Sequence, residues 1–212
     1  MNRNILICLF TLLACAGFAA QTNLTPEQTE ANYTKAIEGR TADILKILAL
    51  SDTNKIARVH DAIIAQYRAL NAWHDANDAK RKAAKSDTNA LAQIEDSLKA
   101  IHNQFLAKLA ENLTPEQVDA VKDKMTYGKV QFTFKGYMVE YPNLPEAQQQ
   151  KVLEFLKEAR ELAMDGGSAE EKSAIFNKYK GKINNYLSKE GFHPPAKKPK
   201  ATNPQLNDQV TR

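Results

Sequence analysis

The chain contains little cysteine, glycine or proline. Its 212 residues include 2 Cys, 8 Gly and 8 Pro, which excludes collagen-like, low-complexity and disulfide-scaffold proteins. Both cysteines, Cys8 and Cys15, lie near the amino terminus, so the rest of the chain has no disulfide and no thiol nucleophile. The fold must therefore depend on packing, for which the length and the 43% hydrophobic content are sufficient.

The sequence also lacks the short motifs of the common catalytic and metal sites. It has no nucleophile elbow, phosphate-binding loop, Cys/His zinc spacing or His-Glu-x-x-His segment. We therefore expect no cofactor, and residue chemistry by itself assigns no reaction.

An excess of one charge is absent from the body of the chain. The formal net charge is +4, but residues 20–193 hold 24 basic and 24 acidic side chains. The excess lies at the two ends, mainly in residues 194–212, which we predict to be a disordered tail rich in Pro and Lys. Because a nucleic-acid-binding face needs a clustered basic excess, we expect no nucleic-acid partner.

The first 19 residues have the pattern of a signal peptide. A basic start precedes an apolar run at residues 5–13 and the segment Gly17-Phe18-Ala19, whose small outer residues suit a cleavage site. The run is too short to span a bilayer, so we expect a periplasmic or secreted protein with no transmembrane span after its removal. Residues 12–15 also resemble a lipobox, and a lipid anchor at Cys15 would instead give an outer-membrane lipoprotein.

Hydrophobic spacing predicts an all-α fold for residues 20–193. Apolar side chains recur at helical spacing between cap-rich breaks at residues 51–54 and 86–89. Residues 25–28 and 114–117 both read Thr-Pro-Glu-Gln, a typical helix start. We expect a single domain, a multi-helix bundle built from long antiparallel helical hairpins.

Glycine complicates two stretches of this pattern. Residues 127–141 alternate like a strand over part of their length and recur like a helix over more of it, so we predict a helix. Gly166 and Gly167 follow the apolar periodicity of residues 145–164, and we expect glycine there to take the left-handed position that ends a helix.

Two histidines and two carboxylates are predicted to lie close together. If the chain reverses near Ser86, the facing helices bring them within one or two turns of each other. Such a set could ligate a metal, but no Glu-x-x-His pair supports that interpretation, and we favour a buried polar network. A catalytic role for His74 with Asp78 or Glu95, as in a lyase or hydrolase, is a further alternative. The cluster consists of His74, Asp78, Glu95 and His102.

Aromatic and amide side chains suggest a carbohydrate site. An exposed indole or phenol ring can stack on the apolar face of a sugar, and amides can hydrogen-bond to paired hydroxyls. The same residues also suit ordinary helix packing with a solvated polar face. The candidate ligand-binding residues are Trp73, His74, Tyr127, Tyr179, Asn184 and Asn185.

Two resemblances to known families bear on function. The repeated Leu-Thr-Pro-Glu-Gln at residues 24–28 and 113–117 resembles the paired Leu-Thr-x-x-Gln of the Spy and CpxP periplasmic chaperones. That resemblance implies an envelope chaperone or scaffold that receives unfolded clients on an apolar concave face.

A longer resemblance extends over about residues 42–192. The segments 55–59, 66–70, 73–75, 125–130, 156–160, 163–165 and 178–187 are similar to an exported bacterial family called domain of unknown function 3826. The resemblance implies that the protein binds sugars and that it occurs in bacteria that digest plant polysaccharides. It assigns no catalytic residues. We therefore expect an exported, non-catalytic carbohydrate-binding protein, with a Spy/CpxP-like chaperone or scaffold as the alternative and a polysaccharide lyase or hydrolase third.

Overall fold

The computed structural model describes residues 24–194, which are helical apart from short connections. The all-α prediction is confirmed, since these residues contain no strand. The predicted signal peptide, Cys15 and the predicted tail beyond Pro194 lie outside the described residues. The helices are α1 (Pro26–Leu48), α2 (Thr53–Ala83), α3 (Thr88–Ala110), α4 (Pro115–Met125), α5 (Lys129–Glu140), α6 (Glu146–Met164) and α7 (Ala169–Lys189).

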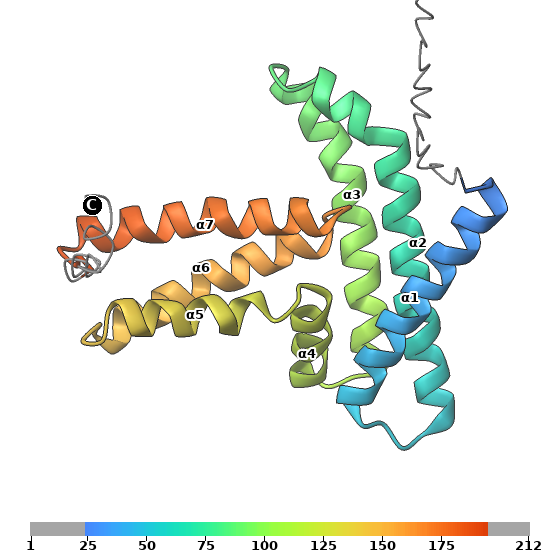
Figure 1. Ribbon diagram of the computed structural model, residues 1–212, viewed down its shortest axis with the longest axis horizontal. Helices are drawn as coiled ribbons and strands as arrows, with labels where there is room; N and C mark the ends of the chain where they lie inside the picture. Colours follow the sequence, from blue (N-terminus) through green and yellow to red (C-terminus); the bar gives the residue numbers. More distant parts are fainter. Residues whose placement is uncertain (1–23, 195–212) are drawn as a thin grey trace, which may run out of the picture. The chain divides into compact units, whose positions relative to one another are not determined.

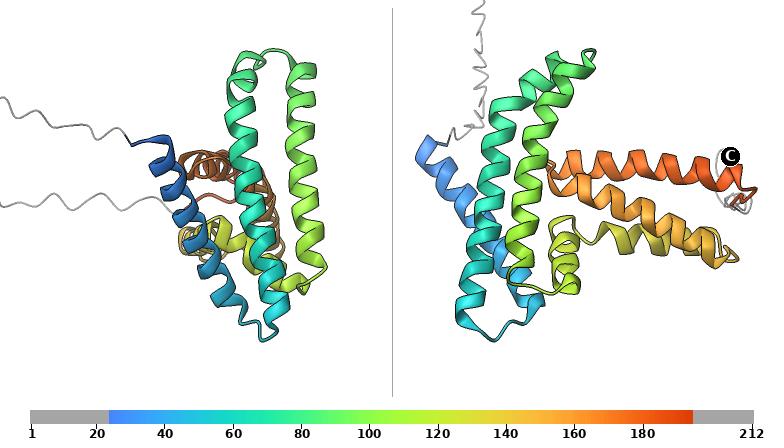
Figure 2. Two further views of the ribbon diagram at one scale, coloured as in Figure 1. Left: turned by 90° about the vertical axis from the view of Figure 1, so that its right-hand side faces the viewer. Right: turned by 180° about the vertical axis from the view of Figure 1, so that it is seen from behind.

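The chain divides after Ala36 into two compact units. In the second unit, α2 and α3 form one long antiparallel hairpin and α6 and α7 form another (Figure 1). The additional views agree that α5 lies beside α6, and α4 packs against both α3 and α6 (Figure 2). The predicted bundle of antiparallel hairpins is confirmed. Within residues 24–194, none of the helices combines the length and the apolar character needed to cross a bilayer.

Short polar side chains begin five of these helices, and at α1 Thr25 and Gln28 each accept a hydrogen bond from the other's backbone N–H. Asp52 accepts two backbone N–H bonds at the start of α2, and Asp87 does the same at α3. Ser168 caps α7, while Thr114 and Gln117 form a reciprocal capping box at α4. Each such cap stabilises the fold by about 1 kcal/mol. The breaks predicted from the sequence are therefore the points at which capping side chains set where the helices begin.

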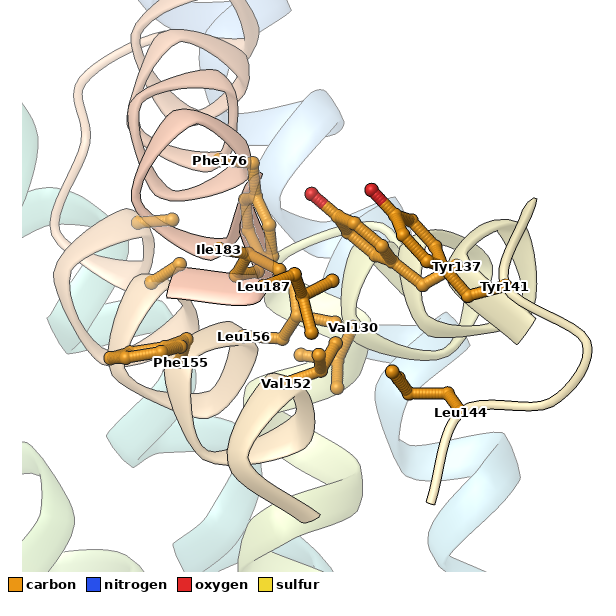
Figure 3. Packing of buried hydrophobic residues seen from close by; sticks show 12 residues of the cluster. Val130, Tyr137, Tyr141, Leu144, Val152, Phe155, Leu156, Phe176, Ile183 and Leu187 are labelled. Carbon is orange, nitrogen blue, oxygen red and sulfur yellow. The ribbon is translucent and has the colours of Figure 1, made fainter. Parts of the chain in front are cut away.

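The α5–α7 region packs around a continuous apolar core (Figure 3). Leu156 of α6 and Ile183 of α7 are completely buried, and Val130 of α5 is nearly so. Burying a side chain of this size stabilises the fold by about 1.5–3 kcal/mol. The predicted helix within residues 127–141 is confirmed as α5, because it presents Val130 and Tyr137 to this core.

A second core joins α1, α2, α3 and α4. Its members come mainly from the carboxyl-terminal parts of α1 and α3 and from the first half of α2, together with Met164 at the end of α6. The buried side chains are Ile44, Leu48, Val59, Ile63, Phe105, Leu109, Leu113, Val121, Met125 and Met164. A smaller cluster of Leu70, Trp73 and Leu98 lies farther along the α2–α3 hairpin.

The prediction for the glycine pair after α6 is wrong. Neither Gly166 nor Gly167 has a positive φ. A Cβ atom on Gly167 would instead lie 2.8 Å from Cγ of His74, and one on Gly166 would lie 3.1 Å from Cγ of Lys172. The two glycines are explained by close packing of His74 and Lys172 against the α6–α7 turn.

Candidate functional site

The predicted ligand-binding residues do not gather at one place. Trp73 and His74 are buried on α2, with 6% and 7% of their surface exposed. The Trp73 indole N–H donates to Ser97 Oγ at 2.7 Å, and the Trp73 ring meets the His74 ring edge to face. Because protein atoms cover its ring, Trp73 offers no face on which a sugar could stack.

Both ring nitrogens of His74 are occupied. Nδ1 lies 2.9 Å from Asp78 Oδ1, and Nε2 lies 2.7 Å from the backbone carbonyl oxygen of Asp165. The imidazole therefore fastens α2 to the end of α6. Neither nitrogen is available to a sugar hydroxyl or for proton transfer.

The proposed histidine and carboxylate cluster forms a network of ion pairs instead of one four-ligand site. Arg81 inserts among its members, with Nε 2.8 Å from Glu95 Oε1 and Nη1 3.3 Å from Asp78 Oδ1. His102 Nδ1 lies 2.9 Å from Asp165 Oδ2. Within residues 24–194, no three His, Cys, Asp or Glu side chains are arranged to hold a metal ion. No pattern in the sequence indicates Arg81 or Asp165 as the partners.

This network borders a cavity of about 550 Å³ between the α2–α3 and α6–α7 hairpins. The Asp165 carboxylate raises the pKa of the His102 imidazole, against the opposing effect of burial. Arg81 is also 3.3 Å from Glu171 Oε1. Five of the charged residues that line this cavity are therefore paired with one another: Arg81, Glu95, Glu171, His102 and Asp165.

Two predicted residues on α7 are exposed, and a third is partly covered. Asn184 and Asn185 lie at the surface. Asn184 Oδ1 accepts a hydrogen bond from the Tyr137 hydroxyl at 2.7 Å and borders a hollow of about 570 Å³ beside α5. The Tyr179 ring packs on the α5–α7 core with the Lys182 ammonium 5.0 Å from its centroid.

Tyr127 lines a different cavity, of about 400 Å³, which we call the Tyr127 cavity. Residues from α1, α2, α7, the end of α4 and the turn after it surround the cavity, and its volume is within the range of small-molecule sites. The Tyr127 side chain is 52% exposed. The other polar lining residues are Arg40, Asp43, Tyr67, Lys124 and Lys172.

The backbone holds Tyr127 in a left-handed conformation, with φ of 59°. Its N–H donates to the Lys124 carbonyl at 3.1 Å, and the Gly128 N–H donates to the Asp123 carbonyl at 2.8 Å. These two bonds form a Schellman motif that ends α4, with Tyr127 at the position that glycine normally occupies. Holding a bulky residue there costs about 1–2 kcal/mol.

The end of α7 uses the same motif with the expected residue. Gly191 has φ of 82° and its N–H donates to the Ser188 carbonyl, while the Phe192 N–H donates to the Leu187 carbonyl at 2.8 Å. The fold of this protein therefore accepts glycine at such a position. The need to end α4 therefore does not explain why tyrosine, and not glycine, occupies position 127.

Three cations of the Tyr127 cavity lack a carboxylate partner. Among residues 24–194, no acidic side chain lies within 4.0 Å of Arg40, Lys124 or Lys172. Lys172 is buried, and its Nζ donates to the Met164 carbonyl at 2.9 Å. Burial, reinforced by the nearby Arg40, lowers the pKa of Lys172 to about 8.

Sequence reasoning identified Tyr127 but missed these cations. Arg40, Lys124 and Lys172 come from three helices that are far apart in the chain. Lysine at the second turn of a predicted helix gives no signal of burial. One signal for this site was present in the sequence. Thr-Tyr-Gly at residues 126–128 indicates that a helix ends just before Gly128, which places Tyr127 at the helix end.

Comparison with known proteins places the chain in a family. A model described as "Protein of unknown function (DUF3826)" matches residues 34–200. No curated protein matches the chain. The matched segment covers most of the sequence and includes every residue of the Tyr127 cavity. The protein belongs to the DUF3826 family.

Proposed function

We propose that this exported protein binds carbohydrate at the Tyr127 cavity without catalysing a reaction. The observation that carries the proposal is the left-handed backbone of Tyr127. A bulky residue in that conformation persists at a cost in stability, and such strain concentrates at binding and catalytic sites. A ligand that uses the phenol ring supplies a reason for it.

The lining of the cavity has the chemistry that a sugar requires. The half-exposed Tyr127 ring offers an apolar face to the C–H side of a pyranose. The Arg40 guanidinium and Lys124 ammonium donate hydrogen bonds, and the Asp43 carboxylate accepts them from hydroxyl groups. The cavity thus combines one stacking surface with donors and an acceptor.

The same lining argues against a glycosidase. Glycoside hydrolysis generally uses two carboxyl groups, about 5–10 Å apart, on opposite sides of the scissile bond. The Tyr127 cavity has Asp43 as its one carboxylate among the lining residues. His74, the residue considered for a lyase or hydrolase, has both nitrogens engaged by protein atoms. Binding without turnover is therefore the simpler proposal.

Calorimetric titration of the protein with neutral and acidic oligosaccharides tests this proposal. We expect Tyr127→Gly to weaken binding by about tenfold or more, since it removes the stacking ring. Ala49→Gly is the matched control, because Ala49 also has a left-handed backbone, with φ of 48°, and does not line the cavity. Failure of every oligosaccharide to bind, or undiminished binding by Tyr127→Gly, would overturn the proposal.

One observation favours a second candidate function, the binding of an apolar protein segment. Phe132 and Val139 on α5 are 77% and 83% exposed, and both border the hollow beside Asn184. Such a surface fits the chaperone or scaffold alternative. If that function holds, the protein will suppress aggregation of an unfolded client at stoichiometric amounts, and Phe132→Ser will remove the effect while Tyr127→Gly leaves it intact.

A further inference from the structure

The described chain contains two buried cations, and they differ in their partners. Arg160 is 4% exposed and lies 2.7 Å from a carboxylate oxygen of both Asp119 and Asp123. Lys172 is 7% exposed, and its one described hydrogen bond goes to a neutral carbonyl, that of Met164. A buried charge without a counter-ion is unfavourable. Lys172 is therefore the cation whose surroundings are incomplete.

The acidic residues nearest to Lys172 are already engaged. Asp165 faces His102 at 2.9 Å. Glu171 accepts from the Gly167 N–H at 2.9 Å and pairs with Arg81. The other charged group that acts on Lys172 is the Arg40 cation of α1, which repels it. Among residues 24–194, no acidic side chain lies within hydrogen-bonding distance of Lys172, which leaves its ammonium open to an anionic ligand.

The position of Lys172 indicates where such an anion would bind. Lys172 lines the Tyr127 cavity from α7, Arg40 lines it from α1 and Lys124 from the end of α4. Cations from three helices thus surround a space that also has an exposed aromatic ring and one carboxylate, Asp43, so the three cations leave the lining with a formal excess of positive charge. An Arg guanidinium presents a planar fork that matches a carboxylate group in two parallel hydrogen bonds.

We propose that the Tyr127 cavity selects a carboxylate-bearing sugar, a uronic acid residue, whose carboxylate is held by Arg40 and Lys172 while Tyr127 stacks on its ring. This inference rests on the proposed carbohydrate function and adds the chemical class of the ligand. A neutral sugar would leave Lys172 without a counter-ion. A small carboxylate without a sugar ring would leave the Tyr127 ring without a partner.

Three matched sets of ligands separate the contribution of the ligand's carboxylate from that of its sugar ring. The protein is titrated with oligosaccharides of galacturonic, glucuronic and mannuronic acid, with the methyl esters of the same oligosaccharides, and with neutral oligosaccharides of the same length. We expect at least one acidic series to bind about tenfold or more tightly than its methyl ester, because esterification removes the charge-assisted hydrogen bonds. Acetate at the same concentration should give no measurable heat.

Variants assign the preference to the cavity. Lys172→Met and Arg40→Gln should each bring the affinity for the acid down to that for the ester, whereas Lys178→Met, on the same helix but outside the cavity, should retain the preference. Arg40 is exposed, so Arg40→Gln gives the answer even if Lys172→Met alters the fold.

The outcomes distinguish the two proposals. Equal binding of acid and ester overturns the selection for uronic acids and leaves the proposed sugar binding standing. No binding of any saccharide overturns both. Binding of acetate as tight as that of the uronic acids overturns the role of the sugar ring.

Discussion

The regions around Arg160 and Lys172 contain the same feature, a buried cation, with opposite surroundings. Arg160 lies on α6 against Asp119 and Asp123 of α4, and it joins two helices as a structural ion pair. Lys172 lies on α7 beside the Tyr127 cavity without a carboxylate of its own. The difference teaches that charge burial alone does not mark a site. The absence of a partner within the described chain distinguishes the cation that is available to a ligand.

Removing the paired cation should have the largest effect on stability. Arg160→Met leaves Asp119 and Asp123 without their counter-ion, and we expect the free energy of unfolding to fall by about 2–3 kcal/mol. This loss is smaller than that for a fully buried pair because water can solvate the two partly exposed carboxylates. Urea denaturation measures the change, and a loss below about 0.5 kcal/mol would contradict the structural role of the pair.

Removing the unpaired cation should have no such cost. Lys172→Met replaces a buried ammonium by an apolar chain of similar length, so we expect stability at pH 7 to stay constant or to rise by about 1 kcal/mol. A loss as large as that of Arg160→Met would mean that Lys172 is a structural residue like Arg160. Urea denaturation of the two variants side by side decides between these results.

The same lysine should give the wild-type protein a pH dependence. The pKa of Lys172 is lowered to about 8, whereas that of an unfolded lysine is 10.5. Between these values the unfolded state binds more protons, so the free energy of unfolding rises with pH, by about 3 kcal/mol in total. Well below pH 8 Lys172 is protonated in both states and contributes nothing to the change of stability with pH. The difference between wild type and Lys172→Met, followed from pH 7 to pH 10.5, should show this rise, and a flat difference would refute the assigned pKa.

The α6–α7 turn beside Lys172 should reject an added methyl group. Gly167→Ala would place Cβ 2.8 Å from Cγ of His74, whose ring is held by two hydrogen bonds, so we expect a loss of about 1–3 kcal/mol. Gly136→Ala on α5 is the control, since its Cβ meets no atom within 4 Å and helix propensity favours Ala by about 1 kcal/mol. Thermal unfolding of both variants should show shifts of opposite sign.

The smallest effect concerns His102. Its pKa is raised by the Asp165 carboxylate, so the pairing stabilises the fold below the ordinary pKa of 6.5, and this contribution is lost as the pH rises through the raised value. NMR titration of the His102 ring should give a pKa above the ordinary value in the wild type. In Asp165→Asn it should fall, because burial and the nearby Lys122 then oppose only the weaker attraction of Glu161. An unchanged pKa in the variant would exclude Asp165 as the cause.

Local chemistry in the sequence was sufficient to predict the helices. Asp52, Asp87 and Thr114 cap where their residue types and spacing indicated, and α5 follows the longer of two competing apolar patterns. These features depend on neighbours within one turn of helix, and the sequence contains that information directly.

The candidate site depended on information that local patterns lack. Trp73 lies at the edge of an apolar face, and only the packing of α3, with Ser97 opposite its N–H, determines that it is buried. Tyr127, directly after the end of α4, has a left-handed backbone. That conformation is favourable for glycine and unfavourable for tyrosine, so the residue type does not predict it. Lys172 reads as a solvated lysine, and only the tertiary fold buries it, with Gly166 of the α6–α7 turn close against its side chain.

NMR mapping of a bound acidic oligosaccharide tests the central claim most directly. On titration of the isotope-labelled protein, we predict that the largest shifts will occur at Tyr127, Gly128 and Lys172, which line the cavity. Saturable shifts there would locate the sugar against the ring that the backbone holds in a left-handed conformation. Shifts confined to Phe132 and Asn184 beside α5, or none at saturating sugar, would contradict the account.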